Sequence, residues 1–233
     1  MSNADNILFR CSSLGHIMTE AKGKTGLSET CKRHLIDVYV SRTYGRNTNI
    51  HNRYTIKGLA VEEDSLTLYS RVSKKFYVKN EDSIKNEFIC GTPDIIADDK
   101  VIDIKSSWDI ITYYRNVFGD LNKQYYWQLQ GYMALTGKDH AELAYCLVNT
   151  PDTLVNDQKR RLMWSMGLID ATQEFDEACA EIEKLAVYDD IPMQDRVHII
   201  KIDRDEETLK KLYERVKACR EYMNQTFYKP QTA

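Results

Sequence analysis

One segment, Cys90–Ser107 with the sequence CGTPDIIADDKVIDIKSS, restricts the possible folds more than any other part of the chain. Two short apolar runs flank an Asp-Asp dipeptide, which is typical of two antiparallel strands joined by a two-residue loop. If Asp98 and Asp99 form the loop, the register places Asp94 opposite Asp103, whereas a turn longer by a residue or two would shift this pairing. Lys105 points to the same face as Asp103, because side chains alternate along a strand. A hairpin with a buried face is therefore expected to present two acids and a lysine together.

Carboxylates that lie directly opposite each other on a sheet repel and destabilise the pair. A divalent cation between Asp94 and Asp103 removes this conflict, and oxygen ligands without Cys or His favour Mg²⁺, with Mn²⁺ as a substitute, over zinc. Lys105 would then lie beside the cation, where a phosphate would bind, and would donate to developing negative charge. The alternative interpretation is a surface hairpin with an ordinary ion pair between Asp103 and Lys105. None of the six cysteines forms a CxxC pair, which argues against a thiolate metal site.

Helix-like and strand-like segments alternate along the 233 residues, which favours a single α/β domain over 1–233, with a central mixed β-sheet flanked by helices. An acidic helical pair at about 155–187 is expected as an insertion in this domain. We expect further helices at 26–45, 55–72, 122–137 and 205–224, a helix start within 11–18, and strands at 74–80, 86–97, 100–107, 140–151 and 196–203.

The net charge of −3 does not indicate a nucleic-acid-binding protein, but the charge is unevenly distributed. The segment 22–57 has eight Lys and Arg residues against two acids, which suits a polyanion or is a solvated face. No apolar run approaches the ~20 residues of a membrane span. The N-terminus lacks the hydrophobic region of a signal peptide, so we expect a cytoplasmic protein.

Two helical positions complete the candidate site. On the helix expected at 55–72, Glu62 shares a face with Leu59, Leu66 and Tyr69, whereas Glu63 lies further toward the polar side, so Glu62 is favoured as the inward ligand. Gln128 lies on an apolar helical face and needs a partner there. That partner is a phosphate or a metal-bound water, or else a backbone group, and Tyr132 on the same face could be core packing alone.

These residues resemble a known family. "GTPD", followed after eight residues by "DIK", resembles the PD-(D/E)XK signature of the restriction-endonuclease-like nucleases. Gln128-x-x-x-Tyr132 and Gly58-x-x-x-Glu62 are similar to the flanking motifs of that superfamily, and all occur in the family's order. The chain from about residue 10 to 224 is similar to the phage lambda exonuclease and YqaJ-type recombinase branch.

The resemblance implies a restriction-endonuclease-like core and assigns roles to residues. Glu62, Asp94 and Asp103 would hold Mg²⁺ together with the backbone carbonyl of Ile104. Lys105 would orient or activate the attacking water, and Gln128 would contact a phosphate. A 5′-phosphate of DNA would bind at a set of residues that aligns by pattern only, namely Thr92, Arg10 and Ser12 or its neighbour Ser13.

The implied activity is a metal-dependent 5′→3′ exonuclease on the ends of linear duplex DNA. It would leave 3′ single strands for a single-strand annealing protein in phage-type recombination, in the host cell cytoplasm. A structure-selective or restriction-like endonuclease is one alternative, and an inactive nuclease-fold module that binds DNA or a partner is another. The middle acid is Asp103, where many relatives have Glu. The acidic helical pair is longer than the corresponding connection in the lambda enzyme, and this difference could alter contacts between subunits. A homo-oligomer of this chain, a trimeric ring, is therefore implied by the resemblance alone.

Overall fold

The computed structural model describes residues 3–21, 23, 26–47 and 53–228 of the chain. Its larger sheet is mixed, with strand order β4-β5-β6-β7. The central pair, β5 and β6, is parallel, and each outer strand is antiparallel to its neighbour. The bounds are Ile95–Ile96 for β4, Lys100–Ser106 for β5, His140–Cys146 for β6 and Val197–Asp203 for β7. This confirms the expected central mixed sheet.

A second, smaller sheet includes β1, the first strand of the described chain. Its strand order is β1-β3-β2, and the bounds are Phe9–Arg10 for β1, Ile89–Gly91 for β3 and Ile84–Lys85 for β2. β1 runs parallel to β3, with Arg10 paired to Cys90. Because β3 leads through Thr92 directly into β4, this sheet connects the N-terminal segment to the 90–107 hairpin.

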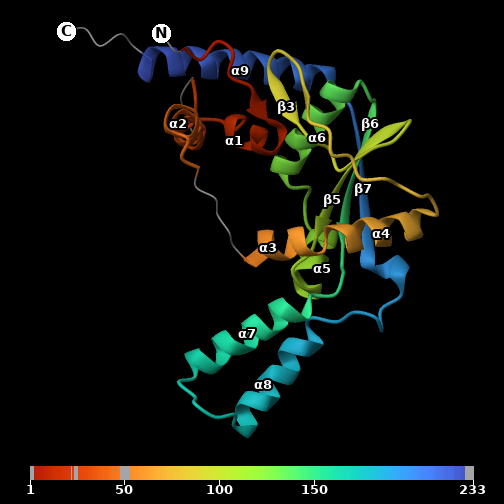
Figure 1. Ribbon diagram of the computed structural model, residues 1–233. Helices are drawn as coiled ribbons and strands as arrows, with labels where there is room; N and C mark the ends of the chain where they lie inside the picture. Colours follow the sequence, from red (N-terminus) through yellow and green to blue (C-terminus); the bar gives the residue numbers. More distant parts are fainter. Residues whose placement is uncertain (1–2, 22, 24–25, 48–52, 229–233) are drawn as a thin grey trace.

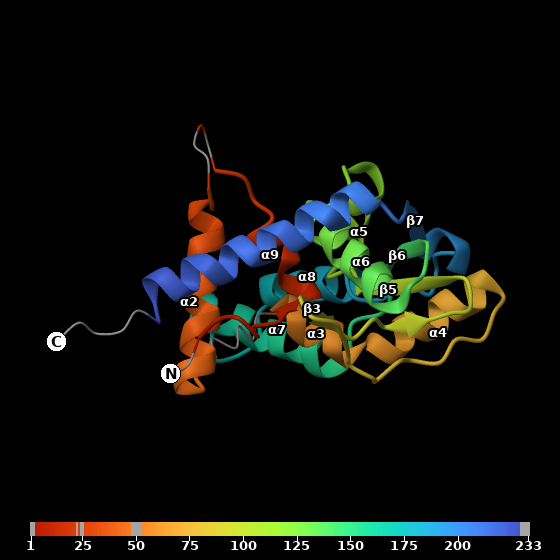
Figure 2. The ribbon, with the colours of Figure 1, turned by 90° about the horizontal axis from the view of Figure 1, so that it is seen from above.

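Helices cover both faces of the larger sheet (Figure 1). One core lies between the sheet, α6 and α9, and the second lies under α4. Figure 2 shows α9 crossing over α2. The bounds are Leu14–Ile17 for α1, Glu29–Tyr44 for α2, Arg53–Ala60 for α3, Glu62–Ser73 for α4, Ile110–Phe118 for α5, Lys123–Thr136 for α6, Asp152–Ser165 for α7, Gln173–Lys184 for α8 and Glu206–Thr226 for α9, with 3₁₀ turns η1 at Cys11–Ser13 and η2 at Met193–Arg196.

Helix α6 packs closely on the N-terminal segment because a glycine lies at the contact. A Cβ on Gly131 would come within 2.7 Å of the Leu14 side chain and 2.8 Å of the Cys11 sulfur. Gly91 is similarly crowded, since a Cβ there would lie 2.7 Å from the ring of Tyr132. These approaches place α6 directly against the start of the 90–107 hairpin.

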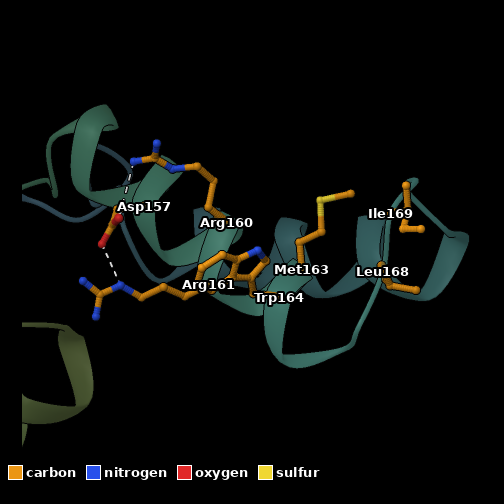
Figure 3. A pocket seen from close by; sticks show the side chains of 7 residues that line it. All are labelled: Asp157, Arg160, Arg161, Met163, Trp164, Leu168 and Ile169. Carbon is orange, nitrogen blue, oxygen red and sulfur yellow. Dashed lines mark hydrogen bonds and ion pairs between the residues drawn. The ribbon is translucent and has the colours of Figure 1, made fainter.

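The α7–α8 hairpin projects from the sheet at the end opposite to α9 (Figure 1). The expected helical pair is therefore present. Its tip is apolar and exposed, with Trp164 89% and Ile169 91% accessible. A surface cavity of about 820 Å³ lies there, and Arg160 and Arg161 at its rim both pair with Asp157 (Figure 3).

The structure corrects three sequence-based expectations. The strand expected at 86–97 is two separate strands, β3 and β4, which belong to different sheets. The helix expected at 55–72 is interrupted at Val61, and Leu59 is 71% exposed rather than inward. The strand expected at 74–80 does not form: Asn80 makes a single backbone hydrogen bond of 2.8 Å to the Asp94 carbonyl, and Phe76 is 90% exposed. This single hydrogen bond lies next to the two-residue strand β4, and one bond is too few to form a regular β-ladder. None of the described helices is long and apolar enough to cross a membrane.

Candidate active site

The β4–β5 hairpin has the register expected from the sequence. A hydrogen bond of 2.9 Å from the Ala97 amide to the Lys100 carbonyl closes the two-residue loop. The next pairing positions beyond the ladder are Asp94 and Asp103. The paired residues within it are Ile96 with Val101 and Ile95 with Ile102.

The two faces of β5 differ as alternation requires. Ile102 is fully buried in the core under α4, and Ile104 packs against the same core. Asp103, on the other face, is only 1% exposed and lies under α6. An acid this deeply buried needs compensating charge or hydrogen bonds, and both are found around it.

The Asp94 carboxylate crosses toward β5. Its Oδ2 accepts a hydrogen bond of 2.6 Å from the Ile104 amide, between Asp103 and Lys105 in sequence. Burial and the nearby charge of Asp103 raise the pKa of Asp94 to about 7, and Lys105 only partly offsets them. Two carboxylates are therefore held together at a place where one resists ionisation.

Lys105 lies beside these acids. Its Nζ is 2.5 Å from Asp103 Oδ2, an ion-pair contact that lacks the geometry of a regular hydrogen bond. The same Nζ lies 5.2 Å from the centroid of the Tyr125 ring. Burial alone lowers the pKa of Lys105, but Asp103 and Asp94 outweigh it and keep that pKa above its usual value. The ammonium is thus a permanent positive charge next to the carboxylate pair.

Gln128 and Tyr132 from α6 form a chain of hydrogen bonds to the hairpin. The Gln128 amide donates to Asp103 Oδ1 at 3.0 Å and to the Tyr132 hydroxyl at 2.9 Å. The Tyr132 hydroxyl donates in turn to the Thr92 carbonyl at 3.2 Å. The buried glutamine therefore has side-chain partners, and its tyrosine neighbour is more than core packing.

Glu62 lies at the start of α4, at the edge of this group. It is half-buried, whereas Glu63 is exposed, in keeping with the preference for Glu62. Its carboxylate pairs with Lys79 at 2.8 Å, and its charge contributes to the raised pKa of Asp94. Glu62 is thus near the two aspartates, but its nearest counter-charge is Lys79.

The donor set is compatible with a divalent cation. Asp103 Oδ2 is buried with the ammonium of Lys105 as its counter-charge. Burial and the charge of Asp103 raise the pKa of Asp94, and a cation would favour its ionised form. The carbonyl of Ile104 lies in the same strand and is a further oxygen ligand. Within the described ranges, three or more His, Cys, Asp or Glu side chains do not converge on a ready-made metal cluster.

The 5′-phosphate candidates are divided between two places. Arg10 and Ser12 line one surface pocket of about 420 Å³, together with Ser13 and, from α2, residues that include Arg42. Thr92 is exposed on the hairpin and does not line that pocket. Arg10, which lines the pocket, nevertheless pairs with Cys90, and Cys90 is only two residues before Thr92 in the chain.

Sequence reasoning missed two charged or aromatic contacts. Lys79 belongs to a segment without regular structure, so no periodicity could assign it to Glu62. Tyr125 is one turn before Gln128 on α6, and that helical spacing was a usable signal for a ring near Lys105.

Comparison with solved structures identifies similar proteins. A phage-related exonuclease from Haemophilus somnus matches with a TM-score of 0.75 and 27% sequence identity, over 96% of this chain and 96% of that one. An alkaline exonuclease from Laribacter hongkongensis matches with a TM-score of 0.62 and 15% identity, over 95% and 94%. Its complex with dAMP gives a TM-score of 0.62 and 16% identity, over 94% and 92%. No protein-family model and no curated protein matches the sequence.

These matches confirm the restriction-endonuclease-like α/β fold and the resemblance to the phage exonuclease branch of the PD-(D/E)XK nucleases. They extend over nearly the whole chain, and they support a nuclease function.

Proposed function

We propose that this chain is a divalent-metal-dependent deoxyribonuclease that digests linear duplex DNA from its 5′ ends. The observation that carries the proposal is the pair formed by half-buried Asp94 and buried Asp103, with Lys105 on the same face of the β4–β5 hairpin. Its overall likeness to a phage-related exonuclease adds support.

Mg²⁺, or Mn²⁺ in its place, would be held by Asp94, Asp103, the Ile104 carbonyl and Glu62. Such a cation supplies a Lewis acid for the scissile phosphate and lowers the pKa of a bound water. Lys105 would orient the attacking water or donate a charge-assisted hydrogen bond to the phosphate as negative charge develops. The Gln128 amide holds Asp103 in place, and by resemblance Gln128 also reaches a phosphate.

The substrate would be bound mainly through its phosphates. Arg10, Ser12 and Arg42 line one pocket, where they would bind a terminal phosphate, and Thr92 would complete the site from the hairpin. Further basic side chains on or near α2 are Lys32, Arg33 and Arg46; Lys22 and Lys24 lie outside the described residues. Binding through phosphates weakens steeply with salt. We therefore expect the KM for DNA to rise strongly when the NaCl concentration is raised from about 50 mM to about 200 mM.

The product would be a duplex with a 3′ single-stranded end, suited to a single-strand annealing protein. A homo-oligomer that encloses DNA would make digestion processive. By the same resemblance, the activity would lie in the host cytoplasm.

The test is digestion of linear duplexes that carry a 5′-phosphate or a 5′-hydroxyl, with Mg²⁺ and with EDTA, beside a closed circular duplex. We expect Mg²⁺-dependent release of mononucleotides, faster from the phosphorylated end, and an intact circle. Cleavage of the circle would favour an endonuclease. Binding of DNA without cleavage under every condition would identify a binding module, and cleavage by the Asp103→Ala variant or in EDTA would refute the metal site.

A further inference from the structure

Lys57, on α3, is a buried cation that the proposed mechanism does not use. It is 1% exposed. Its Nζ donates a hydrogen bond of 2.7 Å to the backbone carbonyl of Trp108. The rings of Trp108 and Tyr188 lie 6.0 Å and 5.8 Å from the same nitrogen. Three segments therefore meet at this side chain: α3, the corner between β5 and α5, and the chain that returns from the α7–α8 hairpin.

Burying this lysine costs free energy, because burial disfavours its charged form. Burial lowers its pKa to about 8, and the carboxylate of Asp109 only partly compensates. An apolar side chain of similar length would avoid the desolvation of a charge, but it would leave the Trp108 carbonyl without this donor. What Lys57 provides in return is a directed contact to one carbonyl.

The contact between Lys57 and Trp108 joins the α3–α4 junction to the end of β5. The Lys57 carbonyl accepts a hydrogen bond of 3.0 Å from the Val61 amide, and Val61 directly precedes Glu62 where α3 ends and α4 begins. Trp108 follows the end of β5, three residues after Lys105. Lys57 thus ties the segment that leads to Glu62 to the residue that follows the end of the catalytic strand.

A second contact holds the other side of Glu62. The hydroxyls of Ser65 and Ser106 are 2.7 Å apart, which joins α4 to the last residue of β5. Glu62 lies between the two anchors, five residues after Lys57 and three before Ser65. The interruption at Val61 leaves the orientation of Glu62 dependent on both anchors rather than on one continuous helix.

We propose that Lys57 is a positioning residue that fixes the α3–α4 junction against the end of β5 and so sets the position of Glu62 relative to Asp94 and Asp103. This inference rests on the proposed function, because it gives Glu62 a role in holding the divalent cation. Residues that orient metal ligands typically change metal affinity by 10- to 100-fold when they are replaced.

The test is the affinity of the metal-free full chain for Mn²⁺, measured by calorimetry, together with urea unfolding in EDTA. We expect K57M to bind Mn²⁺ roughly tenfold more weakly than the wild type, with a cooperative urea unfolding transition in EDTA that shows that the variant folds. Lys138→Met is the matched control, since Lys138 also donates to a backbone carbonyl, that of Asp98 at 2.8 Å, but at the exposed loop of the hairpin. Its Mn²⁺ affinity should match the wild type.

A double-mutant cycle with E62Q separates positioning from general structural effects. If Lys57 acts through Glu62, K57M should not weaken Mn²⁺ binding further in the E62Q background. Additive losses, a Glu62→Gln change without effect, or wild-type Mn²⁺ affinity in K57M would each overturn the inference. If K57M does not fold, K57Q replaces it, with the same expectation because its arm is too short to reach the carbonyl.

Failure of both Lys57 variants to fold would also overturn the inference, since Lys57 would then hold the whole fold. Absence of Mn²⁺ binding by the wild type is a different result. It would refute the proposed metal site itself, and it is distinguishable from wild-type-like binding by K57M.

Discussion

Replacement of Asp94 by Asn should stabilise the metal-free protein above neutral pH while abolishing DNA cleavage. Asn retains an oxygen that can accept the 2.6 Å hydrogen bond from the Ile104 amide. It removes the charge that Asp103 opposes, and with it a proposed metal ligand. Gains in stability on removal of a functional charge are a familiar consequence of strained active sites.

The size of the effect follows from the raised pKa of Asp94. Burial and the charge of Asp103 raise that pKa from 3.8 to about 7. Since one unit corresponds to about 1.36 kcal/mol, the ionised carboxylate destabilises the folded state by at most about 4 kcal/mol. Asp94 is partly accessible to water, so screening should reduce this to about 1–3 kcal/mol. Because the folded pKa is the higher one, stability is lost as pH rises from about 4 to 7.

The assay is urea unfolding in EDTA at about pH 5 and about pH 8, two conditions on either side of the main titration. D94N should be more stable than the wild type at the higher pH by about 1–3 kcal/mol, and the gap should be clearly smaller at the lower pH. Asp99→Asn is the control, because Asp99 is an exposed carboxylate of the same hairpin. Its effect should stay within about 0.5 kcal/mol at both pH values.

A lower stability of D94N at the higher pH, or a gap that does not change with pH, would refute the reasoning. Either result would mean that Asp94 is stabilised by its surroundings as a charged group and that Asp103 does not oppose it. Addition of Mg²⁺ gives an independent check, because it should stabilise the wild type and leave D94N unchanged.

Three further predictions concern the same group. Lys105→Met should slow single-turnover cleavage by about 10²-fold or more, yet calorimetry should show equal or tighter Mn²⁺ binding, because the ammonium no longer competes for Asp103; weaker binding would contradict this. Mn²⁺ affinity should rise about tenfold per pH unit below pH 7 and level off above it, as the cation displaces the proton of Asp94; calorimetry in two buffers of different ionisation enthalpy should detect the released proton, and no release would exclude Asp94 as a ligand. Tyr132→Phe should cost about 1 kcal/mol in urea unfolding and slow cleavage less than Gln128→Ala, which removes the donor to Asp103; the reverse order would argue against the hydrogen-bond chain.

The main features of the β4–β5 hairpin could be predicted from the local sequence pattern. Its register, its loop and the shared face of Asp103 and Lys105 depend on alternation along a strand and on a two-residue turn, and both are written in consecutive residues. The same holds for Gln128 and Tyr132, whose common face follows from helical spacing. The resemblance to phage exonucleases was visible for this reason, since its motifs are local.

Contacts between distant segments required the folded structure. The pairing of Glu62 with Lys79 and the burial of Lys57 beneath Trp108 join residues that no periodicity relates. The interruption at Val61 is similar, because the helical spacing of the segment 55–72 continues through it. In the structure α3 ends at Ala60 and α4 begins at Glu62.

The sequence by itself therefore determined which groups share the site: two opposed acids and a lysine on one strand pair, with an amide from a later helix. The tertiary structure decided how these groups are held and charged. The pKa of Asp94 is raised to about 7 by burial and by the charge of Asp103, and both act only in the folded chain. Electrostatic energies depend on distance and on exclusion of water, and neither quantity exists until the chain has folded.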